Sequence, residues 1–317
     1  MKFIVLVRRH VEENFILASL VLLIVFFGVV SDDFFSMVTL TTILNQVPAL
    51  TLVTVGMTLV LVVAGIDLSA GSVLGFSAAI VGMAVVSWGL PVPLACLMGL
   101  AAGLACGSLN GILVAYLSLP SFIVTLGMLE MARGLAYLTT NSQTVYIGHA
   151  IQEIALPLRV IGVSGSLIVA LVVVVAAQFL LTRTVFGRYL TAIGSNEEAV
   201  RMSGIDSRPY RLIVLSVSGA LAGLAGIFNA AYLGSADPNA GIGLELSAIA
   251  AAVIGGTSLM GGRGSIIGAF AGVLIIATLQ HGLAQLGVTE PSKRLITGAV
   301  IIAAVLIDRW RSSYRVR

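Results

Sequence analysis

Long apolar runs constrain this chain more than any other feature of its sequence. About ten segments, each near the roughly 20 residues that a helix needs to cross a bilayer, follow one another with few charges inside them. Because hydrocarbon offers no partner for a free backbone amide or carbonyl, such runs fold as membrane-spanning helices. The expected helices cover residues 14–30, 44–64, 70–88, 94–116, 121–139, 164–182, 211–233, 244–259, 264–286 and 292–308.

The composition indicates one membrane domain and no soluble one. Charged residues make up only 10% of the chain and the mean hydropathy is +1.09, whereas about a quarter of a soluble domain is charged. No long polar stretch remains for a second core. The sequence therefore predicts an all-α integral membrane protein with a single transmembrane domain over residues 1–317.

The lysines and arginines concentrate in alternate segments between the expected helices. With a cytoplasmic amino terminus, most of the 17 basic residues fall in cytoplasmic segments, as the positive-inside rule requires. They are Lys2, Arg8, Arg9, Arg183, Arg188, Arg201, Arg208, Arg211, Arg263, Arg309, Arg311, Arg315 and Arg317. Both termini are expected in the cytoplasm. Topology explains the net charge of +3, so no nucleic-acid partner is expected.

Two motifs recur 170 residues apart. "GIDLSAGSVLGFSA", which begins at Gly65, aligns with "SADPNAGIGLELSA", which begins at Ser235. If the repeat is genuine, expected helices 2 to 5 recur as helices 7 to 10, and a shift by five helices places the copies in opposite orientations. Inverted repeats of this kind are a device of transporters.

The polar residues and glycines of these motifs predict breaks between helices. The matched positions are Asp67 with Asp237 and Gly71 with Gly241, and Ser69 lies beside the first pair. Two roles are open. Aspartate and serine can cap the following helix by accepting hydrogen bonds from its free amides, or the breaks can serve as paired gates. Capping is the favoured interpretation.

Regularly spaced glycines predict close helix packing. The expected fourth helix carries a glycine at every fourth position, and the ninth shows a similar face. In lipid, small residues let helix backbones approach one another. These glycines are Gly99, Gly103, Gly107, Gly111, Gly264, Gly268 and Gly272.

Residues 183–211 form the longest polar stretch and predict a surface element. Ser195, followed three residues later by Glu198, has the spacing of a capping box that opens a short helix over 197–203, and Gly204 ends it. Apolar side chains give this helix a surface for docking, although an ordinary solvated loop helix is the alternative. The glycine-rich stretch 255–265 lacks the phosphate-binding lysine of a P-loop. If ATP drives this protein, a different polypeptide binds it.

Four blocks of the sequence resemble a known family. They are "VGMTLVLVVAGIDLSAGS", "NGILVAYLSLPSFIVTLGML", "GRYLTAIGSNEEAVRMSGI" and "LELSAIAAAVIGGTSLMGGRGSIIGA". In this order they are similar to the permease subunit of ribose-type ATP-binding-cassette (ABC) sugar importers, within the branched-chain amino acid and sugar permease family. The resemblance implies a core of two permeases, either two copies or this chain with a paralogue. It also implies an ATPase subunit that holds ATP and Mg²⁺, a periplasmic sugar-binding protein, and a bacterial inner membrane.

The resemblance also implies a coupling helix that sits in a cleft of the ATPase. Importer permeases carry an E-A-A-x-x-x-G pattern there, and Glu198, Ala199 and Gly204 match its spacing, with Val200 in place of the second alanine. The isoleucine-x-leucine-proline ending of that pattern is not evident, which leaves the docking contacts open. The implied coupling residues are Gly187, Arg188, Ala192, Gly194, Asn196, Glu198, Ala199 and Gly204.

Several polar residues inside the expected helices are candidates for the transport pathway. Glu130 and Arg133 lie three residues apart on one helix face and can pair, so a structural ion pair is at least as well supported as a pathway contact. Asn110 follows the glycine face of its helix, and Glu245 lies near a helix start. Other polar residues can contact a sugar or join helices: Asn45, Gln46, Asn229, Gln280 and His281. No second histidine or cysteine stands at ligand spacing from His281, so no metal is expected.

Two functions remain open on the sequence. The first is a permease that imports a monosaccharide, has no catalytic residues or bound cofactor, and depends on the separate ATPase. The second is a secondary transporter in which an intramembrane carboxylate carries a proton or ion: Asp67, Glu130, Asp237 or Glu245. An enzyme is not expected, because no nucleophile and base stand together.

Overall fold

The structure is a computed structural model that describes residues 2–31, 33–156 and 163–313. Most of this part of the chain is helical, as the apolar runs predict. The helices are α1 (Lys2–Val30), α2 (Met37–Val62), α3 (Ala70–Val86), α4 (Val92–Tyr116), α5 (Ser121–Thr140), α6 (His149–Gln152), α7 (Gly165–Arg183), α8 (Val185–Ser195), α9 (Glu197–Met202), α10 (Arg208–Leu233), α11 (Leu244–Ile254), α12 (Ile266–Gln285) and α13 (Glu290–Ser313).

Six of the described helices are long and apolar enough to cross a membrane: α2, α4, α5, α7, α10 and α12. Three shorter apolar helices accompany them: residues 16–30 of α1, together with α3 and α11. Most bounds agree with those predicted to within a few residues. Four differ clearly, since α1 begins at Lys2, α2 begins at Met37, α11 stops at Ile254 and α13 continues to Ser313.

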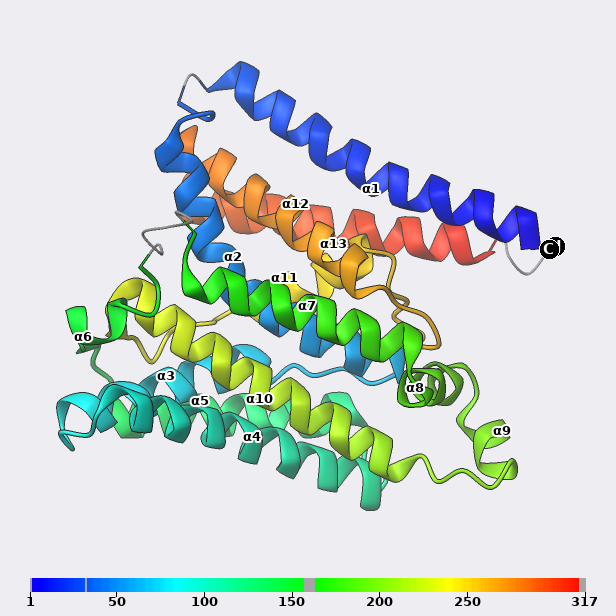
Figure 1. Cartoon of the computed structure of the whole chain (residues 1–317), viewed down its shortest axis with the longest axis horizontal. Coiled ribbons are helices and arrows are strands. Elements are labelled where there is room, and N and C mark those ends of the chain that lie inside the picture. Colours follow the sequence, from blue (N-terminus) through cyan, green and yellow to red (C-terminus); the bar gives the residue numbers. More distant parts are fainter. Residues whose placement is uncertain (1, 32, 157–162, 314–317) are drawn as a thin grey trace.

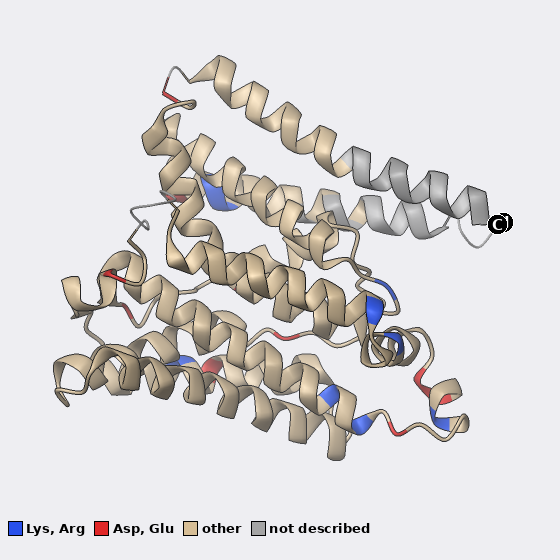
Figure 2. Ribbon diagram, in the orientation of Figure 1, with Lys and Arg blue, Asp and Glu red and all other residues tan. Residues whose placement is uncertain are grey.

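The long helices run roughly along one axis of the molecule (Figure 1). Helices α8 and α9 lie at one end of this bundle, and α6 lies at the other. Charged residues gather mainly at these ends and in the loops, whereas the described helices between them are almost free of charge (Figure 2). This distribution suits a bundle whose middle lies in hydrocarbon.

Helices α4 and α10 pack glycine against glycine. A Cβ atom on Gly103 would lie 2.7 Å from Gly223 Cα, and one on Gly107 would lie 2.8 Å from Gly219 Cα. On α12, Gly268 and Gly272 lie against the backbones of Gly255 and α11. The predicted close packing of both glycine faces is confirmed, except that Gly264 precedes α12 and lies against Val62 and Thr257.

Helix α2 forms the centre of the bundle. It contacts α7, α10, α11 and α12, and its residues from Val47 to Val62 are almost all buried. The fully buried side chains of Leu52, Met57 and Leu61 belong to the main hydrophobic core. Long-range packing around one central helix therefore holds the two halves of the chain together.

Two local features complete the fold. The strands β1 (Val145–Tyr146) and β2 (Ser235–Ala236) pair antiparallel at the end near α6, a small sheet that the all-α prediction did not include.

At the start of α12, Gln178 of α7 accepts hydrogen bonds from the backbone amides of Ile266 (2.9 Å) and Ile267 (3.2 Å). Because the first amides of a helix have no partner within it, this side chain anchors α12 to α7.

Candidate functional site

A buried carboxylate fixes the loop between α2 and α3. Asp67 is only 1% exposed. Its Oδ1 accepts hydrogen bonds from the backbone amide (3.0 Å) and hydroxyl (2.6 Å) of Ser69, and its Oδ2 accepts one from the Ser218 hydroxyl of α10 (2.7 Å). Asn110 of α4 donates to Ser69 Oγ (3.0 Å). These contacts join the loop to α4 and α10.

Neither aspartate of the repeated motif caps a helix, so the capping interpretation is wrong. Asp67 closes a turn onto Ser69, and Asp237 closes a similar turn onto the amide (2.9 Å) and side chain (3.1 Å) of Asn239. The residue that precedes α3 is Ser69, whose side chain makes no capping hydrogen bond. The residue that precedes α11 is Gly243, which has no side chain to cap with. An aspartate that bonds to the amide two residues ahead favours a turn over a helix start.

The two motif glycines meet back to back. A Cβ atom on Gly71 would collide with the Gly241 carbonyl and the Glu245 carboxylate, and one on Gly241 would lie 3.0 Å from the Gly71 carbonyl carbon. Gly241 also has φ of +78°, a conformation that L side chains rarely adopt. The starts of the two matched segments therefore approach as closely as backbones can.

The predicted pair of Glu130 and Arg133 does not form in the described structure. Arg133 Nη1 donates to the carbonyls of Pro238 and Ala240 (2.9 Å for Ala240). Glu130 is exposed on α5. Free carbonyls in a turn are strong acceptors for a guanidinium. Arg133 therefore bonds to the turn that leads into α11 and does not bond to Glu130.

Helix α8 is fixed tightly at both ends. Gly187 lies against the backbone of Leu180 and Leu181, and Gly194 lies against the Val62 carbonyl and the Gly262 amide. No room exists for a side chain at either glycine without a backbone shift. Tyr210 of α10 contacts the rings of Phe186 and Tyr189, so α8 is held by α2, α7, α10 and the 255–265 loop.

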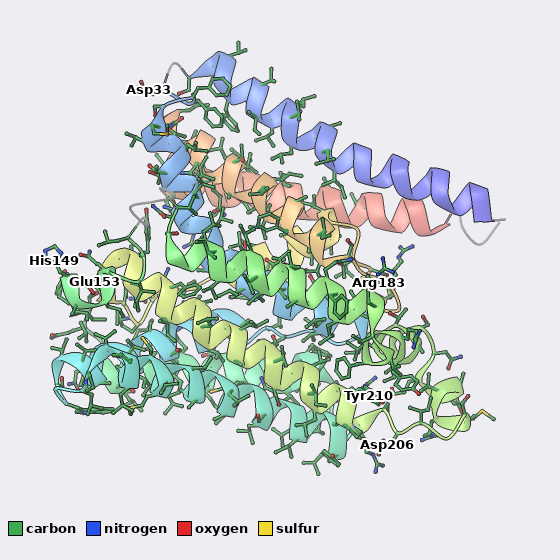
Figure 3. All side chains as sticks on the ribbon, in the orientation of Figure 1. Asp33, His149, Glu153, Arg183, Asp206 and Tyr210 are labelled. Carbon is green, nitrogen blue, oxygen red and sulfur yellow. The ribbon has the colours of Figure 1, made fainter. Side chains whose placement is uncertain are left out.

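The aromatic contacts of Tyr210 join α8 to the start of α10. Its ring centroid lies 5.5 Å from that of Phe186 and 5.4 Å from that of Tyr189. Figure 3 shows Tyr210 near Arg183 and Asp206 at this end of the molecule, with Asp33, His149 and Glu153 at the opposite end. Aromatic pairs at such spacing contribute beyond their buried area.

The short helix α9 forms where predicted, but its cap differs by one residue. Asn196 accepts the hydrogen bond from the Ala199 amide (3.0 Å), whereas the Ser195 hydroxyl donates back to the Thr191 carbonyl (2.8 Å). The predicted capping box is therefore wrong. Ser195 is the last residue of α8, and a serine inside a helix commonly bonds to the carbonyl four residues earlier.

Internal contacts hold one face of α9. Glu197 accepts hydrogen bonds from the Ser207 hydroxyl (2.6 Å) and the Arg211 guanidinium (2.6 Å). Val200 is buried and belongs to the same hydrophobic cluster as Leu190 and Ile193 of α8. These three contacts pin α9 to the start of α10, so the helix is a fixed part of the surface.

The other face of α9 is free. Glu198 and Ala199 are exposed, and Met202 is 84% exposed. Gly204 follows in open space with φ of +82° and ends the helix. Glu198 also borders a groove of about 900 Å³, lined by α9, the start of α10 and the end of α4. Of the other implied coupling residues, Arg188 and Asn196 are exposed, Ala192 is half-buried, and Gly187 and Gly194 are buried.

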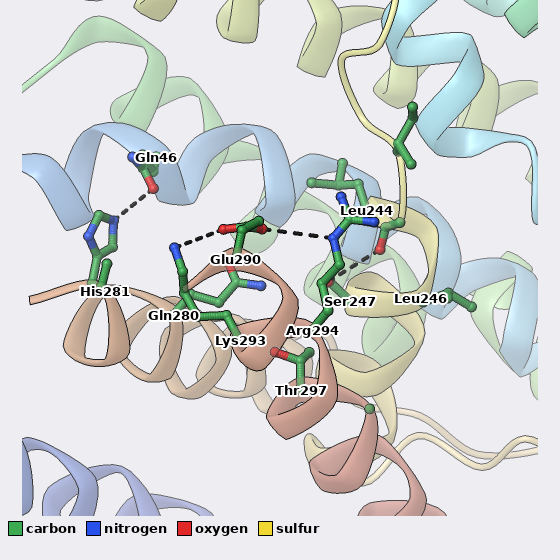
Figure 4. A pocket seen from close by; sticks show the side chains of 14 residues that line it. Gln46, Leu244, Leu246, Ser247, Gln280, His281, Glu290, Lys293, Arg294 and Thr297 are labelled. Atoms are coloured by element: carbon green, nitrogen blue, oxygen red, sulfur yellow. Dashed lines mark hydrogen bonds and ion pairs between the residues drawn. The ribbon is translucent and has the colours of Figure 1, made fainter. Parts of the chain in front are cut away.

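Two adjoining cavities lie toward the other end of the bundle. The wide cavity, about 490 Å³, is lined by α2, α11, α12 and α13 (Figure 4). The narrow cavity, about 230 Å³, is lined by α2, α10, α11 and α12. Gln46, Gln280, Ser247 and Leu244 line both, so the cavities adjoin along these residues.

The favoured pathway residues do not line either cavity. Asn110 is buried in the Asp67 network, Arg133 and Glu245 hold the turn before α11, and Glu130 faces outward. The cavity linings include the polar residues that the sequence offered only as alternatives. They are Asn45, Gln46, Asn229, Gln280 and His281. Their shared signal is an amide or imidazole within an apolar run, but the sequence does not show that they converge.

The Asp67 network gives a test on stability. Replacing Ser218 with alanine leaves the buried Oδ2 of Asp67 without its donor, and a buried polar atom left unsatisfied costs about 1–3 kcal/mol. We expect Ser218→Ala to lower the free energy of unfolding by about 2 kcal/mol in denaturant titrations of the detergent-purified protein. Ser216→Ala on the same helix, which loses a bond between two hydroxyls, should cost less than about 1 kcal/mol. Equal losses would contradict the assignment of Asp67 as the centre of the network.

The described apolar helices, their glycine packing and the polar cavities among them define the chain as a multi-pass membrane transport protein. The chain belongs to the family described as "Branched-chain amino acid transport system / permease component", whose model matches residues 39–305. This confirms the family resemblance of the sequence. A permease component is a transport subunit and not an enzyme. The candidate membrane spans and the permease relatives indicate a multi-pass protein of the inner membrane.

Three curated relatives are similar over nearly the whole chain. The ribose import permease protein RbsC of Escherichia coli (strain K12) is 40% identical over 308 residues, covering 95% of each chain. The fructose import permease protein FrcC of Rhizobium meliloti is 36% identical, covering 93% of this chain and 84% of its own. The autoinducer 2 import system permease protein LsrC of Photorhabdus luminescens is 34% identical, covering 95% and 91%. No solved structure matches.

Proposed function

We propose that this chain is the membrane subunit of an ATP-driven importer that carries a monosaccharide into the cytoplasm. The named relatives import ribose, fructose and autoinducer 2, which supports a small polyhydroxylated substrate. The chain binds no cofactor in this proposal, because ATP and Mg²⁺ belong to a separate ATPase. A periplasmic binding protein delivers the sugar, and a second permease, identical or related, completes the membrane core.

The observation that carries the proposal is the two-faced helix α9. One face is fixed to α10 through Glu197 and Val200, while Glu198, Ala199 and Met202 are left exposed, with Glu198 at the edge of a groove. A surface helix held in this way can receive a partner and pass its movement to the membrane helices as a rigid-body tilt. We place the ATPase on this face.

The orientation follows from the same placement. In Figure 1, α1 begins and α13 ends at the end of the bundle that carries α8 and α9. With the ATPase in the cytoplasm, both termini lie on the cytoplasmic side, and the two cavities lie toward the binding protein. The contact between Gly71 and Gly241 supports an inverted repeat of α2–α5 and α10–α13, since residues matched at an offset of 170 meet there.

Uptake by the complete complex in proteoliposomes tests the proposal. Sugar uptake is expected to stop when ATP is withheld and to continue when the proton gradient is collapsed. A secondary transporter would give the opposite result, and uptake that needs the gradient alone would overturn the proposal. Asp67 is satisfied by three donors and lines neither cavity, which favours a structural role over a proton carrier.

A further inference from the structure

The narrow cavity offers uncharged hydrogen-bonding groups. Its polar lining consists of the amides of Asn45, Gln46, Asn229 and Gln280 with the hydroxyls of Tyr232 and Ser247. No lysine, arginine, aspartate or glutamate lines this cavity. Amides and hydroxyls both donate and accept hydrogen bonds. Such a lining matches a ligand that carries several hydroxyl groups and no charge.

Much of this hydrogen-bonding capacity is unused. Among the described residues, the side chains of Asn45, Asn229 and Gln280 have no hydrogen-bond partner, and none of the three is buried. Gln46 is oriented by contacts to His281 (2.7 Å) and, more weakly, to the Tyr232 hydroxyl (3.5 Å). The cavity therefore combines one positioned amide with three amides that can bond a ligand.

The charged groups lie in the wide cavity and are largely paired with each other. Glu290 contacts Lys293 (2.8 Å) and Arg294 (3.9 Å), as Figure 4 shows. The hydrogen bond and charge of Lys293 hold the pKa of the Glu290 carboxyl below its ordinary value. An anionic ligand would find cations only in the wide cavity and none in the narrow one. A neutral ligand and an anionic ligand would therefore favour different cavities.

We propose that the adjoining cavities form a binding site for a neutral polyhydroxylated ligand of monosaccharide size, in which Gln280 and Asn229 contact ligand hydroxyls. The wide cavity falls within the range of about 300–1,000 Å³ that is usual for small-molecule sites. Leu244 and Phe228 supply apolar surface for the carbon skeleton of the ligand. The inference rests on the proposed import function and assigns that function a site within the membrane bundle.

Ligand binding to the full-length permease in lipid nanodiscs tests the site directly. Saturation-transfer NMR with D-ribose and D-fructose detects weak binding and needs no ATPase. Gln280→Leu and Asn229→Leu are each expected to raise the Kd of the bound sugar about fivefold to tenfold, the loss of one ligand hydrogen bond. Gln143→Leu is the matched control, because Gln143 is exposed and lines neither cavity.

Each outcome decides the inference. Binding that is weakened about fivefold to tenfold in both cavity variants and kept in the control supports the site. Equal binding in all variants, or no binding of either sugar, overturns it. Tighter binding of D-ribose 5-phosphate than of D-ribose, lost on Lys293→Gln, would replace it with an anion site. ATP-dependent uptake by the wild-type complex is measured separately, so failure of the site with normal uptake leaves the proposed function standing.

Thermal unfolding of each variant accompanies the binding measurement. The side chains of Gln280 and Asn229 have no hydrogen-bond partner to lose among the described residues. The leucine variants are therefore expected to keep the wild-type unfolding midpoint within a few degrees. A variant that unfolds early is replaced by Gln280→Asn, which keeps the amide and shortens its reach. That variant is expected to bind the sugar more weakly than wild type, and wild-type affinity would count against contact with Gln280.

Discussion

Gly107→Ala is expected to destabilise the permease by about 3 kcal/mol, although alanine is the better helix former. A Cβ atom at this position would collide with the Leu215 carbonyl and would lie 2.8 Å from Gly219 Cα and 2.9 Å from Gly219 N. These are backbone atoms, which cannot rotate away, so α4 and α10 would have to separate. Overpacking of a tight interface typically costs about 1–3 kcal/mol, and contact with a backbone belongs at the upper end.

Gly127→Ala provides the matched control for this prediction. Gly127 also lies inside a helix, but no atom outside its own helix lies within 4 Å of the Cβ position. The same substitution should therefore leave stability unchanged or raise it by up to about 1 kcal/mol through helix propensity. Denaturant titration of both variants in detergent measures the difference. Similar stabilities would show that α4 and α10 do not pack through their glycines.

Glu198→Lys is expected to lower ATP-driven transport at least tenfold while the chain still folds. Glu198 is exposed and has no partner among the described residues, so the fold does not depend on it. If α9 docks in the ATPase, reversal of this charge places a lysine against a surface that complements a carboxylate. Like charges across an interface cost several kcal/mol. Copurification of the ATPase and sugar uptake are the two measurements.

Glu153→Lys makes the same charge reversal at the opposite end of the molecule. Glu153 is exposed near α6, where Figure 3 shows it. This variant should keep both ATPase copurification and the response of transport to ATP. Normal transport by the Glu198→Lys variant, or equal loss in the two variants, would count against docking through α9. The comparison separates a specific contact from a general effect of added positive charge.

The helices were predictable because hydrocarbon imposes one rule on every span. The expected segment 121–139 corresponds to Ser121–Thr140, and 164–182 corresponds to Gly165–Arg183. The glycine spacing on α4 also predicted close packing. Its partner was not predictable, since Gly219 and Gly223 are more than 100 residues away and their pairing depends on the three-dimensional arrangement. Repetition along one helix shows which face packs but not what it packs against.

Local patterns failed where a side chain had a distant alternative. Arg133 has Glu130 at the right spacing, yet it reaches the carbonyls of residues 238 and 240 on another segment. Ser195 and Asn196 are both good capping residues, and only the end of α8 decides between them. The cavities follow the same principle. Four separate helices supply each lining, so their polar residues converge only in the folded chain.

Because Gln178 anchors the start of α12, a tilt of this helix about that point moves its opposite end the most. The anchored end lies beside α7, which leads directly into α8, and the far end carries Gln280 and His281 into the wide cavity. At 1.5 Å per residue His281 lies about 22 Å from the anchored start of the helix, so a tilt of about 5° displaces it by about 2 Å relative to a fixed α2. That travel exceeds what the 2.7 Å contact between His281 and Gln46 can tolerate. A small rotation at one side of the membrane is thus enough to break a hydrogen bond at the other.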